Sequence, residues 1–268
     1  MWATLALATA LNVAPAQSAT LQLKNDRVTY GALGQVRKET KFLGGDLVVI
    51  AFDIEGLKER DDGFVKYSMS MDVLNSEGKS QFRQDPVDLE VFTALGGGRV
   101  PGLAFVFVGN DQPEGEYTAK VTIKDRSTDT SATLIRKFEV VQHRFGFVQV
   151  GLSHRDAPTL AAPQVAGVGE ALDLNFSVVG FELDKSRKDQ PSIETSLRIL
   201  DEDGKPTLAK PYGGLANEAP PEYKKGLPMK FSLYLNRPGK FKLEVKATDK
   251  VAKKNATLLL DLTVVEAK

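Results

Sequence analysis

One segment of the chain recurs at a displacement of 124 residues, and this repeat constrains the fold more than any other feature of the sequence. Residues 115–125, GEYTAKVTIKD, correspond to residues 239–249, GKFKLEVKATD. The same displacement joins further identical residues, namely Gly45 with Gly169, Phe52 with Phe176, Gly56 with Gly180, and Val140 with Val264. The repeat predicts two copies of one folded unit.

Within each copy, apolar and polar residues alternate as they do in strands buried on one face. Tyr117, Ala119, Val121 and Ile123 would share one side of a strand, because successive side chains of a strand point to opposite faces. The pattern predicts strands at 21–28, 47–54, 65–74, 103–108, 116–124 and 136–141, and again at 145–153, 172–179, 193–200, 229–235, 241–247 and 258–265. No long window keeps a helical period, so we predict an all-β fold. Short strands separated by turns, such as 75–78 and 201–204, favour a β-sandwich.

The repeated motif Gly-x-aromatic-x-x-x-Val-x-x-x-Asp, at 115–125 and 239–249, resembles the late strands of bacterial immunoglobulin-like, fibronectin type III-like and PKD-like domains. The intersheet cysteine pair and core tryptophan of antibody domains are missing from both copies. The segments 29–31, 44–46 and 236–239 are also similar to uncharacterised secreted proteins of planctomycete bacteria, a resemblance that implies no activity.

These observations together predict two tandem immunoglobulin-like β-sandwich domains related by internal duplication. We place the first at 20–141 and the second at 145–267, with a junction near 142–144. Because so short a junction leaves little freedom, we expect the two sandwiches to stack end to end as a semi-rigid rod.

Residues 1–19 are predicted to be a signal peptide. An uncharged run rich in Ala and Leu is followed by small residues, and the run is too short to span a bilayer as a helix. We therefore expect a secreted, periplasmic or cell-surface protein with no integral membrane segment in the mature chain. The segment contains Trp2, the only tryptophan of the chain.

Composition excludes several classes of function. Lys plus Arg and Asp plus Glu both number 35, so the net charge is zero and the basic excess typical of nucleic-acid binding is missing. The chain has no cysteine, which removes disulfides, thiolate nucleophiles and cysteine-bound metals.

No catalytic, cofactor-binding or metal-binding residues are assigned. His143 and His154, with Asp156 nearby, are interpreted as surface residues rather than a metal or pH-sensing site, because no nucleophile elbow or third ligand accompanies them. Gly-Gly-Gly-Arg at 96–99 is interpreted as a flexible connection rather than a phosphate loop. Asp-Glu-Asp-Gly at 201–204 is too short for a calcium-binding EF-hand loop.

Asp125 and Asp249 are the most notable carboxylates because they recur. We expect each to cap a hairpin by accepting backbone hydrogen bonds, with calcium binding as the alternative. The basic clusters at 185–188 and 250–254 are interpreted as solvated turns.

The leading functional hypothesis is a non-catalytic structural or interaction module of the cell envelope that contacts a protein or a surface polymer. The alternative is a carbohydrate- or polymer-binding module that uses two long loops, 93–102 and 211–228, the second of which contains Tyr212, Tyr223, Lys224 and Lys225. An enzyme with a cryptic carboxylate site is the third hypothesis.

Overall fold

The alternating segments form strands throughout the computed structural model, which describes residues 20–266 and contains no α-helix in that range. The predicted all-β fold is therefore confirmed. The predicted signal peptide, with Trp2, lies outside the described residues. Within them, no helix is long and apolar enough to cross a membrane.

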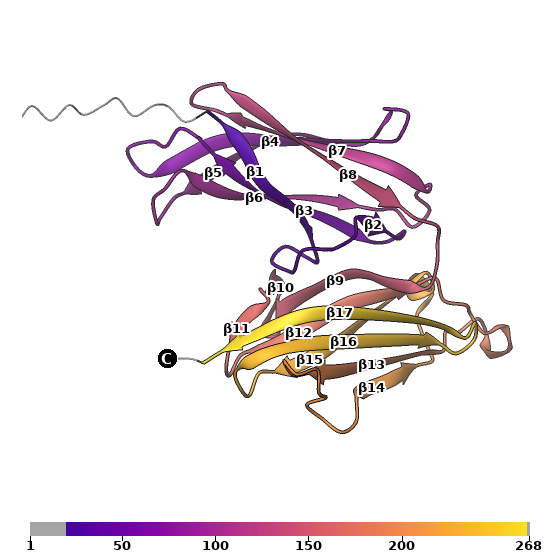
Figure 1. Ribbon diagram of the computed structural model, residues 1–268. Coiled ribbons are helices and arrows are strands. Elements are labelled where there is room, and N and C mark those ends of the chain that lie inside the picture. The colour runs from indigo at the N-terminus through magenta and orange to yellow at the C-terminus, as the bar shows by residue number, and fades with distance from the viewer. Residues whose placement is uncertain (1–19, 267–268) are drawn as a thin grey trace, which may run out of the picture.

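The first half of the described chain, residues 20–141, contains two sheets that face each other (Figure 1). One has the strand order β1-β3-β6 and the other β2-β8-β7-β4-β5. The strands are β1 Gln22–Thr29, β2 Lys41–Phe42, β3 Leu47–Glu55, β4 Phe64–Leu74, β5 Ser80–Phe92, β6 Arg99–Phe107, β7 Gly115–Asp125 and β8 Ser131–Val140. Core side chains come from both sheets, and Phe52 of β3 and Ile123 of β7 are fully buried.

The second half, residues 145–266, contains two further sheets, with the strand orders β10-β9-β12-β15 and β11-β17-β16-β13-β14. Its strands are β9 Gly146–His154, β10 Ala157–Ala161, β11 Val165–Gly167, β12 Ala171–Val179, β13 Ile193–Leu200, β14 Tyr212–Ala216, β15 Gly226–Tyr234, β16 Gly239–Asp249 and β17 Lys254–Val265. Two short 3₁₀ helices, η1 Lys185–Arg187 and η2 Pro221–Tyr223, lie between strands. A separate core, with Leu174 and Leu243 fully buried, fills this half.

The predicted long loops are shorter than expected, because edge strands occupy part of them. Residues 99–102 belong to β6, so the first loop is confined to 93–98. The segment 211–228 contains the edge strand β14, η2 and the start of β15, so the connection between its strands is confined to residues 217–225. Strand β5 was not predicted either, although residues 87–91 alternate between apolar and polar, because the strand lies at the edge of its sheet and most of its residues are exposed.

Asp125 and Asp249 cap hairpins as expected, and each carboxylate also joins the two sheets of its half. Both side chains are fully buried. Asp125 accepts backbone N–H bonds from Ser127 and Thr128 in the β7–β8 turn, at 2.7 and 3.3 Å. Its other oxygen accepts the N–H of Lys58 at 2.8 Å, in the segment that leaves β3 of the opposite sheet.

Asp249 repeats this arrangement in the second half. It accepts N–H bonds from Val251 and Ala252 at 2.9 and 3.2 Å, and from Glu182 at 2.9 Å. In each half, one carboxylate therefore satisfies three backbone donors at the place where the two sheets meet.

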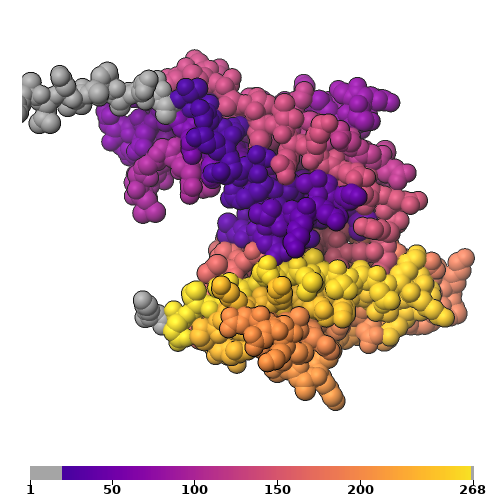
Figure 2. Space-filling view, in the orientation of Figure 1, coloured from indigo at the N-terminus to yellow at the C-terminus, as the bar shows by residue number. Residues whose placement is uncertain are grey.

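The two halves do not stack end to end as a rod. Loops at one end of the first half lie against the side of the second half formed by β9 and β17, so the chain folds back on itself (Figure 1). In Figure 2 the indigo atoms of the first half rest directly on the yellow atoms of β17. The side-chain carbonyl oxygen of Gln35 accepts the N–H of Asp261 at 2.9 Å, and its amide donates to the carbonyl of Leu259 at 3.2 Å.

A buried ion pair organises this contact. Asp46, with 3% of its side chain exposed, accepts a hydrogen bond from Nη1 of Arg37 at 2.9 Å. Its other oxygen accepts the backbone N–H of Gln149 in the second half at 2.8 Å. The Arg37 guanidinium lies between the rings of Tyr30 and Phe42, 4.7 and 4.1 Å from their centroids. The first-half loop therefore holds a charge that is satisfied partly by the second half.

We expect removal of either capping carboxylate to destabilise the protein strongly. Asp125→Ala and Asp249→Ala each leave three backbone donors without their acceptor, which should cost about 3 kcal/mol of unfolding free energy. Urea denaturation checks this, with the exposed Asp156→Ala as control at about 0.5 kcal/mol or less. Losses no greater than that of the control would contradict the structural role of the caps.

Breaking the buried ion pair of Asp46 should lower the unfolding free energy far more than breaking an ion pair of the same length at the surface. Arg136 and Asp26 also lie 2.9 Å apart, but about a third of each side chain is exposed. We expect Asp46→Ala to lower the unfolding free energy by about 3–5 kcal/mol, because it leaves Arg37 buried without its partner. Asp26→Ala should cost about 1 kcal/mol or less.

Small-angle X-ray scattering on the same two variants tests the contact between the halves. Asp46→Ala should increase the radius of gyration, while Asp26→Ala should leave it unchanged. An unchanged radius in Asp46→Ala would mean that other contacts suffice to hold the halves together.

Candidate functional site

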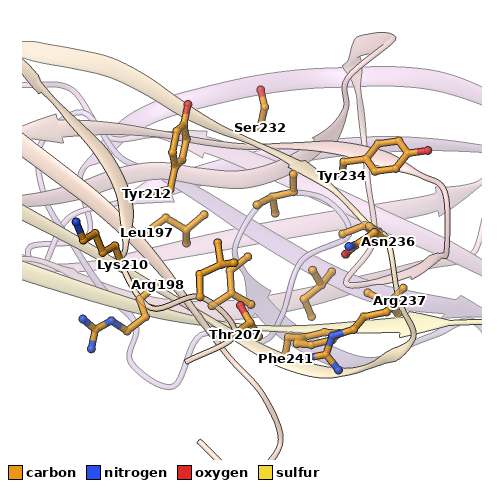
Figure 3. A pocket seen from close by; sticks show the side chains of 16 residues that line it. Leu197, Arg198, Thr207, Lys210, Tyr212, Ser232, Tyr234, Asn236, Arg237 and Phe241 are labelled. Carbon is orange, nitrogen blue, oxygen red and sulfur yellow. The ribbon is translucent and has the colours of Figure 1, made fainter. Parts of the chain in front are cut away.

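A cavity of about 290 Å³ opens between the two sheets of the second half (Figure 3). It lies at the end where β13 and β15 finish and β16 begins. Its inner surface is apolar and belongs to the core, with Leu197, Leu233, Leu235, Phe241, Leu262 and Val264 contributing. The cavity is therefore a gap in the packing between the sheets that reaches the surface.

The rim of this cavity carries cations and aromatic rings. Arg198, Lys210 and Arg237 line it, and none of the sixteen lining residues within the described range is Asp or Glu. Tyr212 and Tyr234 stand on opposite sides of the opening in Figure 3, with 64% and 67% of their surfaces exposed. The site combines an apolar interior with a positively charged, aromatic rim.

The sequence opens this gap by interrupting the edge strand. After the turn that follows β13, the segment 206–211 makes no regular ladder, and β14 begins only at Tyr212. Pro206 and Pro211 bracket that segment, and neither has an N–H to donate to a ladder. Lys210, in the same segment, and Tyr212 form one wall of the cavity (Figure 3).

The nearest buried carboxylate, Asp173 of β12, is fully engaged. It accepts hydrogen bonds from Lys230 and Ser232 of β15, both at 2.7 Å, and Arg155 lies 3.6 Å away. These hydrogen bonds hold the pKa of the Asp173 carboxyl below its usual range. Asp173 therefore stays ionised and fixes Ser232, a lining residue, without adding uncompensated negative charge near the rim.

A second, wider cleft of about 730 Å³ lies at the junction of the two halves. Polar residues such as Arg37, Gln35 and Asp46 line much of it. Because Gln35 and Asp46 are already bonded across the junction, their hydrogen-bonding capacity goes largely into the contact between the halves.

The structure does not bring the predicted polar candidates together. His143 lies in the junction before β9, whereas His154 is the last residue of β9, 3.9 Å from Glu170. Within residues 20–266, no group of three or more His, Cys, Asp or Glu side chains is arranged to hold a metal ion. The calcium alternative for Asp125 and Asp249 thus finds no ligand cluster, and their oxygens already accept backbone N–H bonds.

The glycine-rich and acidic turns are structural. The glycines at 96–98 precede strand β6 rather than a helix, which fits the predicted connection. Asp201 caps its own turn by accepting the N–H of Asp203 at 3.1 Å and of Lys205 at 2.8 Å. The cluster 185–188 includes η1, and the cluster 250–254 forms the β16–β17 turn.

The two segments of the predicted polymer-binding surface lie apart. Loop 93–98 joins β5 and β6 in the first half, whereas Tyr212 and Tyr223 belong to two different elements of the second half, β14 and η2. Only Tyr212 lines the cavity. The prediction missed Arg198, Lys210, Tyr234 and Arg237, although the two prolines of the segment 206–211 signal an interrupted strand.

Comparison with known proteins finds no family model that matches the chain and no curated protein with significant sequence similarity to it. The function is therefore argued from the site itself.

The hydrogen bonds that Asp173 accepts from Lys230 and Ser232, called the Asp173 cluster below, predict how the unfolding free energy changes at acid pH. Because its pKa is lower in the folded than in the unfolded chain, Asp173 stabilises the fold above the unfolded value of about 3.9. This contribution is lost as the pH falls through the lower folded value. Asp173→Asn should therefore weaken the fall in unfolding free energy between about pH 5 and about pH 2. Urea titrations at several pH values check this, and Asp156→Asn should keep the wild-type slope.

Proposed function

We propose that the chain is a pair of immunoglobulin-like domains, duplicated from one unit, that acts as a non-catalytic interaction module secreted to the periplasm or cell surface. The cavity in the second half is its binding site for a partner. The observation that carries the proposal is the open, apolar cavity with a cationic and aromatic rim, within residues 20–266, whose buried carboxylates are all hydrogen-bonded to groups of the fold.

Matching backbone details support the duplication. Asn25 in β1 and Gln149 in β9 both have a positive φ, 52° and 53°, and each lies in a bulge of its strand. Asp129 and Lys253, in the last turn of each half, have φ values of 58° and 55°. Residues other than glycine adopt this conformation uncommonly, so its recurrence at a displacement of 124 favours a common origin.

The strand registers locate where the two copies differ. Gly115 pairs with Val140, and Gly239 with Val264, which preserves the displacement of 124. In contrast, Ile193 of β13 occupies the place of Tyr67 in β4, because each pairs with the capping aspartate of its half. The displacement is therefore two residues longer there, and insertions between the strands account for the difference.

The roles of the buried carboxylates support a non-catalytic function. Among residues 20–266, the buried Asp46, Asp125, Asp173 and Asp249 accept hydrogen bonds from backbone N–H groups or cationic side chains, and the fifth buried carboxylate, Asp53, accepts one from the Asn25 amide. General acid–base catalysis needs a carboxyl group within reach of substrate and with a pKa near the working pH. The pKa of Asp173 is shifted away from neutrality, which suits a structural role.

Binding to cell-envelope material tests the proposal. The mature protein, fluorescently labelled, is sedimented with an envelope fraction from the source cells, and unlabelled protein is used as competitor. We expect saturable binding that weakens about tenfold or more in Tyr234→Ala and Tyr212→Ala, because exposed tyrosines at binding sites carry much of the affinity. Tyr223→Ala is the matched control, since Tyr223 is exposed but lies outside the cavity.

Two results would contradict this proposal. Weakening by Tyr223→Ala alone would favour the polymer-binding alternative at the segment 211–228. Reproducible hydrolase turnover that disappears on a single Asp or Glu substitution would establish an enzyme instead.

A further inference from the structure

At the end of the second half where the cavity opens, two phenylalanines of the first half have smaller counterparts, and one of these counterparts, Leu262, lines the cavity. In the first half, Phe42, Tyr117 and Phe138 fill the corresponding end of the sandwich. Tyr117 stacks on Phe138 with ring centroids 5.7 Å apart, and Phe42 meets Phe138 edge-on at 5.8 Å. The Tyr117 hydroxyl donates to the carbonyl of Pro113, which closes this end.

Strand register identifies the residues that replace this aromatic cluster. Tyr117 pairs with Phe138, as Phe241 pairs with Leu262. Phe42 pairs with Val140, as Ala166 pairs with Val264. The second half thus has leucine and alanine where the first has two phenylalanines, and space remains between its sheets.

Empty apolar space between sheets is unfavourable, because side chains at its walls lose packing contacts. Here the gap also has an entrance, since the segment 206–211 leaves the edge of the sheet. A volume of about 290 Å³ is at the lower end of the range for small-molecule sites. These features suit a compact ligand with an apolar body better than a peptide strand.

The cationic side chains at the entrance indicate which chemical group the other end of the ligand carries. Arg198, Lys210 and Arg237 form no ion pair with a carboxylate of residues 20–266. The Arg237 guanidinium is held 4.9 Å above the ring of Phe241, which places it at the boundary between apolar floor and rim. Figure 3 places Arg237 on one side of the opening and Arg198 and Lys210 on the other, so an anionic group at the boundary between floor and rim would meet Arg237.

We infer that this cavity binds a small anionic amphiphile. Its apolar body lies between the sheets against Leu233 and Leu262, and its single carboxylate or phosphate head group lies at the rim against Arg237. The inference rests on the proposed binding function and assigns the chemistry of the ligand.

Isothermal titration calorimetry with four decyl compounds, kept below their micelle-forming concentrations, tests the inference on the mature chain. Decanoate and decyl phosphate carry the required charge, and their comparison distinguishes a carboxylate from a phosphate head group. Decanol is the neutral control and decyltrimethylammonium the cationic one. We expect saturable one-to-one binding of at least one anionic compound, with decanol weaker by about tenfold and no binding of the cation.

Single substitutions test whether the ligand binds in the cavity. Arg237→Gln should weaken the anionic ligand about tenfold, because a charge-assisted hydrogen bond is lost, and should leave decanol unaffected. Leu262→Phe, which restores the first-half residue type, should fill the cavity and abolish binding of both. Lys242→Gln removes an exposed cation of β16 outside the cavity and should change nothing. Thermal melts of each variant verify that it folds.

Three results would contradict the inference. Equal affinity for decanoate and decanol would show that the positive charge at the rim does not contribute to binding. Binding that survives Leu262→Phe in a folded protein would place the ligand elsewhere. Binding of an acidic apolar peptide or of anionic vesicles without any binding of the decyl anions would assign the site to a macromolecular partner. In that last case, envelope binding that depends on Tyr234 would still stand, so this inference fails separately from the proposed function.

Discussion

The structure depends on buried carboxylates that satisfy backbone donors at places where separate elements must meet. Asp125 and Asp249 each end a strand of one sheet and accept an N–H from the segment leaving the opposite sheet. A chain without cysteine has no disulfide to join its sheets at this point. A carboxylate side chain with three backbone donors joins the two sheets instead, because leaving such donors unpaired inside the protein would be costly.

The same interaction fixes the halves to each other. Asp46 satisfies a donor of the second half at Gln149, whose backbone adopts a positive φ within a bulge of β9. That bulge turns an N–H out of the ladder and towards the first half. Asn25 occupies the equivalent bulge in β1, but its side chain bonds to Asp53 of its own half. One kind of backbone irregularity therefore serves internal packing in the first half and the contact between the halves in the second.

Sequence periodicity could reveal the central strands because burial on one face imposes a period of two. Edge strands escape this reasoning: β5 is exposed along most of its length, and β14 contains two consecutive glycines. The contact between the halves could not be predicted either. In the sequence Asp46 resembles any aspartate of a turn, and only the folded structure shows that it bonds to the backbone of Gln149. The cap at Asp125 was predictable because its turn donors are local in sequence, whereas its bond to Lys58 was not.

The candidate site could not be predicted from the sequence, for a related reason. Its cations are scattered over β13, the segment 206–211 and the β15–β16 turn, and each alone resembles an ordinary surface residue. They line one cavity, in whose wall Leu262 stands where the first half has the larger Phe138. On the proposed duplication, the first half keeps a filled end that has become the contact surface for the second. The second half has the corresponding end facing solvent, where reduced side-chain volume leaves a cavity rather than a weakened interface. Smaller core residues are tolerable there only if the remaining β12–β15 ladder and the Asp173 cluster hold the sheet in place, and both lie beside the cavity.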